Sequence, residues 1–285
     1  MFSPRLIHLF FFTILCSTCL QAQVLHLESA ESRALSGSVQ SGATTHSLNV
    51  NPSQNSADST HPLLISLGVT PNEQGLANAY TASAEGIYYS ANLGLSFSLG
   101  FAQQRFSDSY ADAEAYIGIN KSFQLSGSRT ASIGARFRYE AFTFSSVYLP
   151  LKFYLLDLGL SFDLNSEFSI GATAINLLGS GYTISNEKRE DRPQIFLLGA
   201  SFHPNDVPIS IYTSLEEQDP VGLTIHFGAS YSPVTYLILR AGTSTDTGDF
   251  TAGVGLKYDV IGIDVGTRFG SIFGNTFTFG LNARW

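Results

Sequence analysis

Cysteine is nearly absent from this sequence: two occur among 285 residues, Cys16 and Cys19, and both lie close to the N-terminus. If that region is removed on export, as argued below, the mature chain has no thiol. A chain without thiols has no disulfide framework, no thiolate metal site and no cysteine nucleophile. An exported chain of this kind needs another source of stability, and a closed, hydrogen-bonded barrel in lipid provides one.

Charge is scarce as well. Lys, Arg, Asp and Glu make up 13% of the residues, about half their share in an average soluble domain. The 15 basic residues are outnumbered by 23 acidic ones, which gives a formal net charge of −8. This balance argues against nucleic acid as a partner, because phosphate binding requires a basic surface. The single Trp and Met contrast with 26 Gly and 22 Phe, a mixture that suits a membrane barrel better than membrane helices.

The N-terminal residues have the layout of a secretory signal peptide. Arg5 precedes an apolar run over residues 6–19, and Leu20-Gln21-Ala22 offers a small residue for cleavage. The alternative, a transmembrane anchor, is weaker because the run is shorter than the roughly 20 residues that span a bilayer. We therefore expect a signal peptide over residues 1–22, a polar and flexible segment over residues 23–61, and a barrel over residues 62–285.

Apolar and polar side chains alternate along most of the remaining chain. Between Val221 and Tyr231, every second residue is Val, Leu, Ile, Phe, Ala or Tyr, and the residues between them are polar or Gly. In a β-strand this alternation gives one apolar face and one polar face. We count about twelve such segments, or fourteen if the front of the domain supplies two, each about as long as a tilted strand that crosses a bilayer. A short helix near residues 73–84 is the exception.

The pattern therefore predicts an all-β protein: an antiparallel transmembrane β-barrel of about 12–14 strands in the bacterial outer membrane. A soluble β-sandwich would show the same alternation and stays the alternative. Phe and Tyr near the ends of the apolar faces favour the barrel, because aromatic side chains gather at membrane interfaces. Closure would also remove the exposed edges of so many strands. The expected partners are outer-membrane lipid and the outer-membrane assembly machinery.

The last segment, residues 275–285, carries the alternation without a break. Phe277, Phe279 and Trp285 share its apolar face, and Thr276 and Thr278 lie on the polar one. We expect this segment to be the strand that closes the barrel. We also expect Phe277, Phe279 and Trp285 to form the signal that the assembly machinery reads.

Charged side chains on the polar faces would line the lumen of such a barrel. They are Arg136, Arg138, Glu140, Arg240, Lys257, Asp264, Arg268 and Arg284. Charges of both signs in one interior either pair into a network that fills a small barrel or form a selective lining that contacts a ligand. Both interpretations stay open. The second one predicts that neutralising Arg136 and Arg138 changes passage more than folding.

No catalytic, cofactor or metal site is indicated by the sequence. His226 stands alone on a polar face, where a packed polar filler is more common than a metal ligand or a base. No histidine lies in a context that suggests a nucleophile triad. The Gly-Ser-Gly at residues 179–181 lacks the strand-to-helix pattern of a phosphate loop. We expect a protein that is not an enzyme and that binds no metal or cofactor.

Two stretches carry a family resemblance. Residues 71–95 read PNEQGLANAYTASAEGIYYSANLGL, and LRAG at residues 239–242 is followed by FTAGVGLK at residues 250–257. These stretches resemble the opening signature and closing strands of the FadL-like outer-membrane barrels, in particular the PorV/PorQ branch found with type IX secretion. Residues 90–95 depart from the signature because they lack its proline. Such motifs bear on fold more than on activity.

The resemblance implies one of two roles. FadL-like barrels imply diffusion of hydrophobic molecules across the outer membrane. The PorV/PorQ branch implies service to secretion, with type IX secretion components or secreted cargo as partners. The front region is too polar to look like the packed plug of fatty-acid transporters, which weakens the first role. Three hypotheses follow: a barrel for small or hydrophobic molecules, a secretion adaptor or scaffold without transport activity, and a soluble exported β protein.

Overall fold

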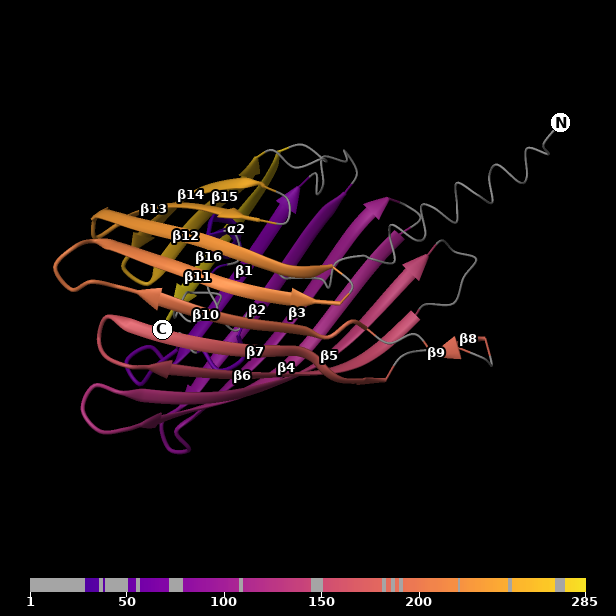
Figure 1. Cartoon of the computed structure of the whole chain (residues 1–285), viewed down its shortest axis with the longest axis horizontal. Coiled ribbons are helices and arrows are strands. Elements are labelled where there is room, and N and C mark those ends of the chain that lie inside the picture. The colour runs from indigo at the N-terminus through magenta and orange to yellow at the C-terminus, as the bar shows by residue number, and fades with distance from the viewer. Residues whose placement is uncertain are drawn as a thin grey trace.

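The computed structural model of the chain describes residues 29–35, 38, 51–54, 57–71, 79–107, 110–144, 151–180, 183–185, 188–189, 192–219, 221–245, 248–269 and 275–285. Within them, fourteen strands close into one antiparallel barrel (Figure 1). Strands that follow one another in the chain lie side by side in the wall, except that β7 is followed by β10. The expected signal peptide, residues 1–22, lies outside the described residues.

The first seven barrel strands form the half of the wall that precedes the longest connection. They are β1 (Leu63–Pro71), β2 (Tyr80–Ser90), β3 (Leu95–Ser107), β4 (Tyr110–Gln124), β5 (Thr130–Phe144), β6 (Leu151–Asp163) and β7 (Phe168–Ser180). The second half contains β10 (Ile195–Phe202), β11 (Ile209–Gln218), β12 (Gly222–Val234), β13 (Leu237–Ser244), β14 (Phe250–Tyr258), β15 (Ile261–Phe269) and β16 (Thr276–Arg284). Strands β8 (Thr183–Ser185) and β9 (Lys188–Arg189) form a separate two-stranded sheet.

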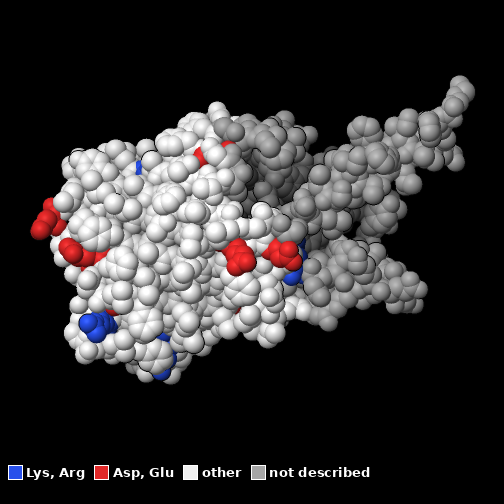
Figure 2. All heavy atoms as spheres, viewed as in Figure 1, with Lys and Arg blue, Asp and Glu red and all other residues white. Residues whose placement is uncertain are grey.

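The barrel has its apolar side chains on the outside. On β16, Phe277 and Phe279 are nearly half exposed, whereas Thr276 and Thr278, which alternate with them, are buried. Exposed apolar side chains alternate with buried polar ones in the same way on other strands of the wall. Figure 2 shows an outer face with few, scattered charged side chains. Large apolar side chains turned outward over a whole barrel require a lipid environment. The prediction of an antiparallel transmembrane barrel of 12–14 strands is therefore confirmed at fourteen.

Strands β1 and β16 form the seam that closes the barrel. They pair antiparallel from Leu64 opposite Arg284 to Val69 opposite Phe279. At one end of the seam, the backbones of Leu63 and Trp285 exchange two hydrogen bonds of 3.0 and 2.9 Å. The front of the domain thus supplies two strands, β1 and β2, which is the condition under which the sequence predicts fourteen strands.

The two ends of the barrel differ in their connections. Short turns at residues 91–94, 125–129, 164–167, 203–208, 235–236 and 259–260 close one end, which we call the turn end. The other end, the loop end, includes the longest connection, residues 181–194. Short turns on one side and longer loops on the other are typical of outer-membrane barrels, whose long loops are extracellular.

The helix expected near residues 73–84 is wrong for its described part. Residues from Tyr80 onward belong to β2, which pairs along its length with both β1 and β3. Two complete ladders of hydrogen bonds outweigh the helical tendency of the Ala-rich sequence here. No helix in the described part of the chain is long and apolar enough to cross a membrane.

Candidate functional site in the barrel lumen

A short helix from the N-terminal segment lies inside the barrel (Figure 1). Helix α2 (Ala30–Ala34) begins at Ser29, whose hydroxyl accepts a hydrogen bond of 3.0 Å from the backbone N–H of Ser32. Every residue of α2 is buried, although two of the five are charged. A polar helix is buried here because the barrel wall around it provides matching space and charge.

Glycines on the wall provide the space. A Cβ on Gly266 would overlap the backbone carbonyl of Ala30, and one on Gly253 would overlap the side chain of Ala34. Gly228 and Gly242 leave similar room for Leu35, and Gly280 lies beside Ala30. Glycine on the polar face of successive strands therefore forms a shallow seat on which the backbone of α2 rests.

Ion pairs and hydrogen bonds hold the helix on this seat. Arg240 on β13 donates to Glu31 at 2.7 Å and to Asp264 on β15 at 2.8 Å. Arg33 donates to the hydroxyl of Thr276 at 2.7 Å, and Thr251 donates to the carbonyl of Ala34 at 3.1 Å. The guanidinium of Arg240 thus joins the helix to two strands of the wall. Loss of one partner would leave the remaining charge buried and unpaired, which costs several kcal/mol, about 3–5, of stability.

Residues 51–54 fill a second part of the lumen. Gly134 and Gly159 lie so close to them that a Cβ on either would overlap the backbone or side chain of this segment. Asn51 donates to the carbonyl of Leu160 at 3.1 Å, and Asn120 donates to the carbonyls of Pro52 and Ser53. We refer to residues 29–35 and 51–54 together as the plug.

The plug differs from the expectation of a flexible segment over residues 23–61. Its described residues are buried and bonded to the wall. Composition alone suggested that this segment buries too little apolar surface to become ordered. The structure orders it through glycine contacts and charge pairing, neither of which depends on apolar content. The boundaries of the segment stay a prediction.

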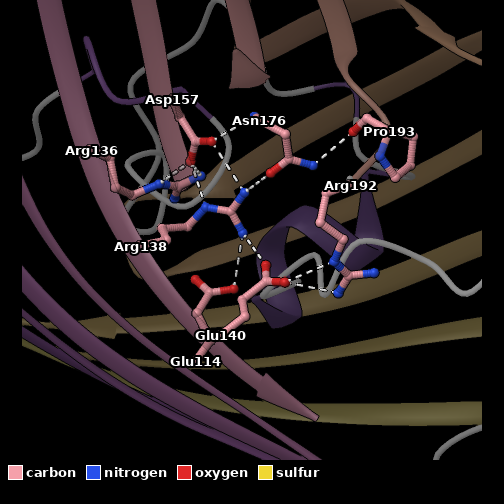
Figure 3. Close-up of polar contacts among 8 residues, drawn as sticks. All are labelled: Glu114, Arg136, Arg138, Glu140, Asp157, Asn176, Arg192 and Pro193. Atoms are coloured by element: carbon pink, nitrogen blue, oxygen red, sulfur yellow. Dashed lines mark hydrogen bonds and ion pairs between the residues drawn. The ribbon is translucent and has the colours of Figure 1, made fainter. Parts of the chain in front are cut away.

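A second charge network lies on β4, β5 and β6 (Figure 3). At its centre Arg138 donates to Asp157 at 2.7 Å, to Glu140 at 2.6 Å and to Glu114 at 3.2 Å. Arg136 also donates a hydrogen bond to Asp157, at 2.8 Å. Glu114 and Glu140 face each other directly across the β4–β5 ladder, and the guanidinium of Arg138 lies between them. Without that guanidinium, two buried carboxylates would repel each other.

Arg192 enters the same network from the connection between β9 and β10. It donates twice to Glu140, at 2.8 and 3.0 Å, and its guanidinium lies over the rings of Phe142 and Phe153, at 4.2 and 5.2 Å from their centroids. The side chain of Arg192 is therefore largely buried, although it lies in a connection between strands. In the sequence, Arg192 is 50 positions from Phe142 and 39 positions from Phe153, so no local pattern reveals this contact.

Apolar side chains also face the lumen near the loop end. Phe142, Phe153 and Leu155 form one buried cluster on β5 and β6, and Ile175, Ile195 and Leu197 form another on β7 and β10. Sequence reasoning missed both clusters because it assigned every inward face to polar residues. A signal was present, since Phe153 and Leu155 interrupt the polar parity that Asp157 and Gly159 continue.

Five of the eight predicted lumen residues belong to the two charge networks. Arg136, Arg138 and Glu140 belong to the network on β5, and Arg240 and Asp264 to the one that holds the helix. All five are buried. Of the other three, Arg268 and Arg284 are partly exposed and Lys257 is exposed. The Nε of Arg268 lies 3.9 Å from a carboxylate oxygen of Asp249. A role of these residues in ligand contact stays a prediction.

The pairing changes what is expected of two of these residues. Because Arg136 and Arg138 neutralise buried carboxylates, their replacement should lower the stability of the barrel. A larger effect on passage than on folding stays a prediction. His226 does not stand alone, since its Nε2 lies 3.2 Å from Glu216. Within the described residues, no group of three His, Cys, Asp or Glu side chains is arranged to hold a metal ion.

Solved structures of similar fold include a toluene transporter, a hydrocarbon channel and an outer-membrane protein. The chain is similar to the toluene transporter TodX of Pseudomonas putida, with a TM-score of 0.61 and 13% identity over 91% of this chain and 97% of TodX. It is similar to the CymD monoaromatic hydrocarbon channel, with a TM-score of 0.61 and 8% identity over 90% of this chain and 97% of CymD. For Omp33 of Acinetobacter baumannii the TM-score is 0.53, with 8% identity over 79% of this chain and 98% of Omp33.

No family model matches the sequence, and no curated protein matches it. At identities this low, the likeness shows the fold alone, a closed antiparallel β-barrel. The FadL-like part of the sequence resemblance agrees with this fold. The PorV/PorQ branch stays a prediction.

Proposed function

We propose that this chain is a barrel of the bacterial outer membrane through which small hydrophobic molecules pass. The observation that carries the proposal is the apolar cluster of Phe142, Phe153 and Leu155 on the lumen side of the wall. A pore for hydrophilic solutes has a polar lining, and apolar side chains inside a membrane barrel favour an apolar ligand. The similarity in fold to TodX and CymD, described as a toluene transporter and a monoaromatic hydrocarbon channel, supports the same class of ligand.

Passage by this route requires the plug to move. Helix α2 lies across β13 to β16, and residues 51–54 contact β4, β5 and β6, so plug residues face both halves of the wall. Apart from Leu35, α2 contacts the wall through small side chains, backbone and charged groups. Such contacts bury little apolar surface, and their release is less costly than the opening of an apolar core. We propose that the plug closes the resting barrel and shifts when a molecule passes.

Uptake by intact cells tests the proposed function. Cells that produce the protein are compared with cells carrying an empty vector, using radiolabelled toluene and, separately, a hydrophilic sugar of similar size. The proposal expects faster toluene uptake and unchanged sugar uptake. Replacement of Phe153 and Leu155 by Gln should lower toluene uptake several-fold, while F162L, on the lipid face, should not. Toluene uptake equal to that of the vector control, with the barrel present in the outer membrane, would contradict the proposal.

A role as a secretion-associated barrel is the second candidate. The sequence resemblance of residues 71–95 and 239–257 to the PorV/PorQ branch favours it. In that case the loop end is the working surface, and type IX secretion components or secreted cargo are the partners. Copurification with secretion subunits, together with toluene uptake no faster than in the vector control, would support this candidate over passage. Neither candidate includes catalysis.

A further inference from the structure

Arg192 lies in an arrangement that suits an organic cation in general. Its guanidinium packs on Phe142 and Phe153, whose rings meet edge to face at 5.8 Å and 87°. The carboxylate of Glu140 accepts two hydrogen bonds from it. Two aromatic faces and a buried carboxylate are the elements with which proteins recognise guanidinium and ammonium groups.

A further acidic side chain, Asp112, is buried beside this arrangement. Asp112 pairs with Phe142 across the β4–β5 ladder and is almost fully buried. One of its carboxylate oxygens, Oδ1, has no hydrogen-bond partner among the described residues. Asp112 lies close enough to Glu114 and Glu140, and to the guanidinium groups of Arg138 and Arg192, to interact electrostatically with them. An unsatisfied buried carboxylate beside aromatic rings favours a further cationic donor.

The parts of the arrangement come from different elements. Phe142, Phe153, Glu140 and Asp112 are all on strands of the wall, where the hydrogen-bonded ladders fix them. Arg192 is outside the barrel strands, in the connection before β10. The wall therefore forms the site, and Arg192 fills it from a separate element. Arg138 is different, because it is itself on β5 and bonds to three carboxylates.

We propose that Phe142, Phe153, Glu140 and Asp112 form a binding site for a guanidinium or alkylammonium group, and that Arg192 occupies this site in the unliganded protein. The ligand class is an organic cation, including the charged head of an amphiphile. The inference goes beyond the proposed passage of hydrophobic molecules and does not depend on it. A cationic ligand would displace Arg192, because both groups require the same two rings and the same carboxylate.

Binding of ethylguanidinium to purified protein in detergent tests the site. Isothermal titration calorimetry is carried out on the wild type and on R192A, with sodium chloride at equal ionic strength as the blank. The site left empty in R192A should bind one equivalent. The wild type should bind at least about tenfold more weakly because its own guanidinium competes. R192Q, which keeps most of the side-chain volume, replaces R192A if the latter does not give a heat-modifiable band.

Two further variants separate a binding site from a structural contact. R192A/F153L keeps an apolar side chain but removes an aromatic face, and R192A/E140Q removes the carboxylate charge. Each should weaken ethylguanidinium binding about tenfold relative to R192A. In the wild type, the Nε–H resonance of Arg192 should shift as ethylguanidinium is added. Absence of saturable binding to a folded Arg192 variant, or equal affinity in the double variants, would overturn the proposal. A wild-type resonance that does not move would do the same.

Discussion

Asp157 on β6 accepts a hydrogen bond of 2.9 Å from the backbone N–H of Asn176 on β7, where the register of these two strands shifts. Asn176 has a φ of 57°, a left-handed conformation that few residues other than Gly and Asn adopt readily. The side chain of Asn176 in turn donates to the carbonyl of Pro193 at 2.8 Å. Since Asp157 also accepts from Arg136 and Arg138, one buried carboxylate fixes both the bulge and the charge network (Figure 3).

Replacement of Asp157 by Asn should destabilise the barrel by about 3–5 kcal/mol, because two buried guanidinium groups lose their shared anion. Urea unfolding in lipid vesicles, followed by circular dichroism, measures the change. D206N removes an exposed carboxylate from a turn and serves as the control. Equal unfolding midpoints for D157N and D206N would show that the network contributes nothing to stability.

Substitution of Gly266 by Ala should displace helix α2, because the added Cβ overlaps the backbone of Ala30. Ser32 is buried in α2, so S32C provides a thiol whose reaction with a maleimide reports on the position of the helix. Labelling should be slow in S32C alone and faster in S32C/G266A. The control is S32C/G86A, since a Cβ on Gly86 meets no atom within 4 Å. If G86A accelerates labelling as much as G266A, the glycine seat does not hold the helix.

Charge on the lipid-facing side of β16 should block membrane assembly. Phe277 and Phe279 are exposed on the outer face, so F277D/F279D would place two carboxylates in lipid, which is unfavourable for a barrel. F277L/F279L keeps the face apolar and should assemble. Deletion of Trp285 is likewise expected to lower assembly. The amount of heat-modifiable protein in outer-membrane fractions gives the answer, and normal amounts of the Asp variant would contradict the lipid-facing assignment.

Acidification should weaken the turn end near His203. Burial lowers the pKa of His203, which lies next to Tyr212 with its Nε2 3.3 Å from the phenol oxygen. A histidine with a lowered pKa in the folded state binds fewer protons than in the unfolded state, so stability falls as the pH drops below about 6.5. H203Q should show a smaller loss of stability between pH 7 and pH 5 than the wild type. An identical pH dependence would exclude this contribution.

The strands and their orientation could be predicted because they depend on a local pattern. Alternation with a period of two identifies both faces of a strand from its own residues. For this reason Arg136, Arg138 and Asp264 were assigned correctly to the inside. The pattern also predicts the number of strands to within two, and the presence of β1 and β2 gives fourteen.

The plug and the Arg192 contact could not be predicted because they depend on residues far apart in the chain. Glu31 and Arg240 are separated by 209 positions, and nothing in either neighbourhood indicates the other. One signal was available: glycines such as Gly253 and Gly266 recur on the polar face, where small side chains leave room for another backbone. Without knowledge of what rests on them, they resemble ordinary strand glycines.

A disulfide between the plug and the wall tests the central claim most directly. The Cβ of Ala30 lies 3.5 Å from the position of a Cβ on Gly280, a separation that a disulfide accommodates. Toluene uptake by cells that produce A30C/G280C is measured with the protein oxidised and then reduced, with each single Cys variant as a control. We predict uptake at the vector level when the plug is locked and at the wild-type rate after reduction. Wild-type uptake in the fully oxidised form would contradict passage past a displaced plug.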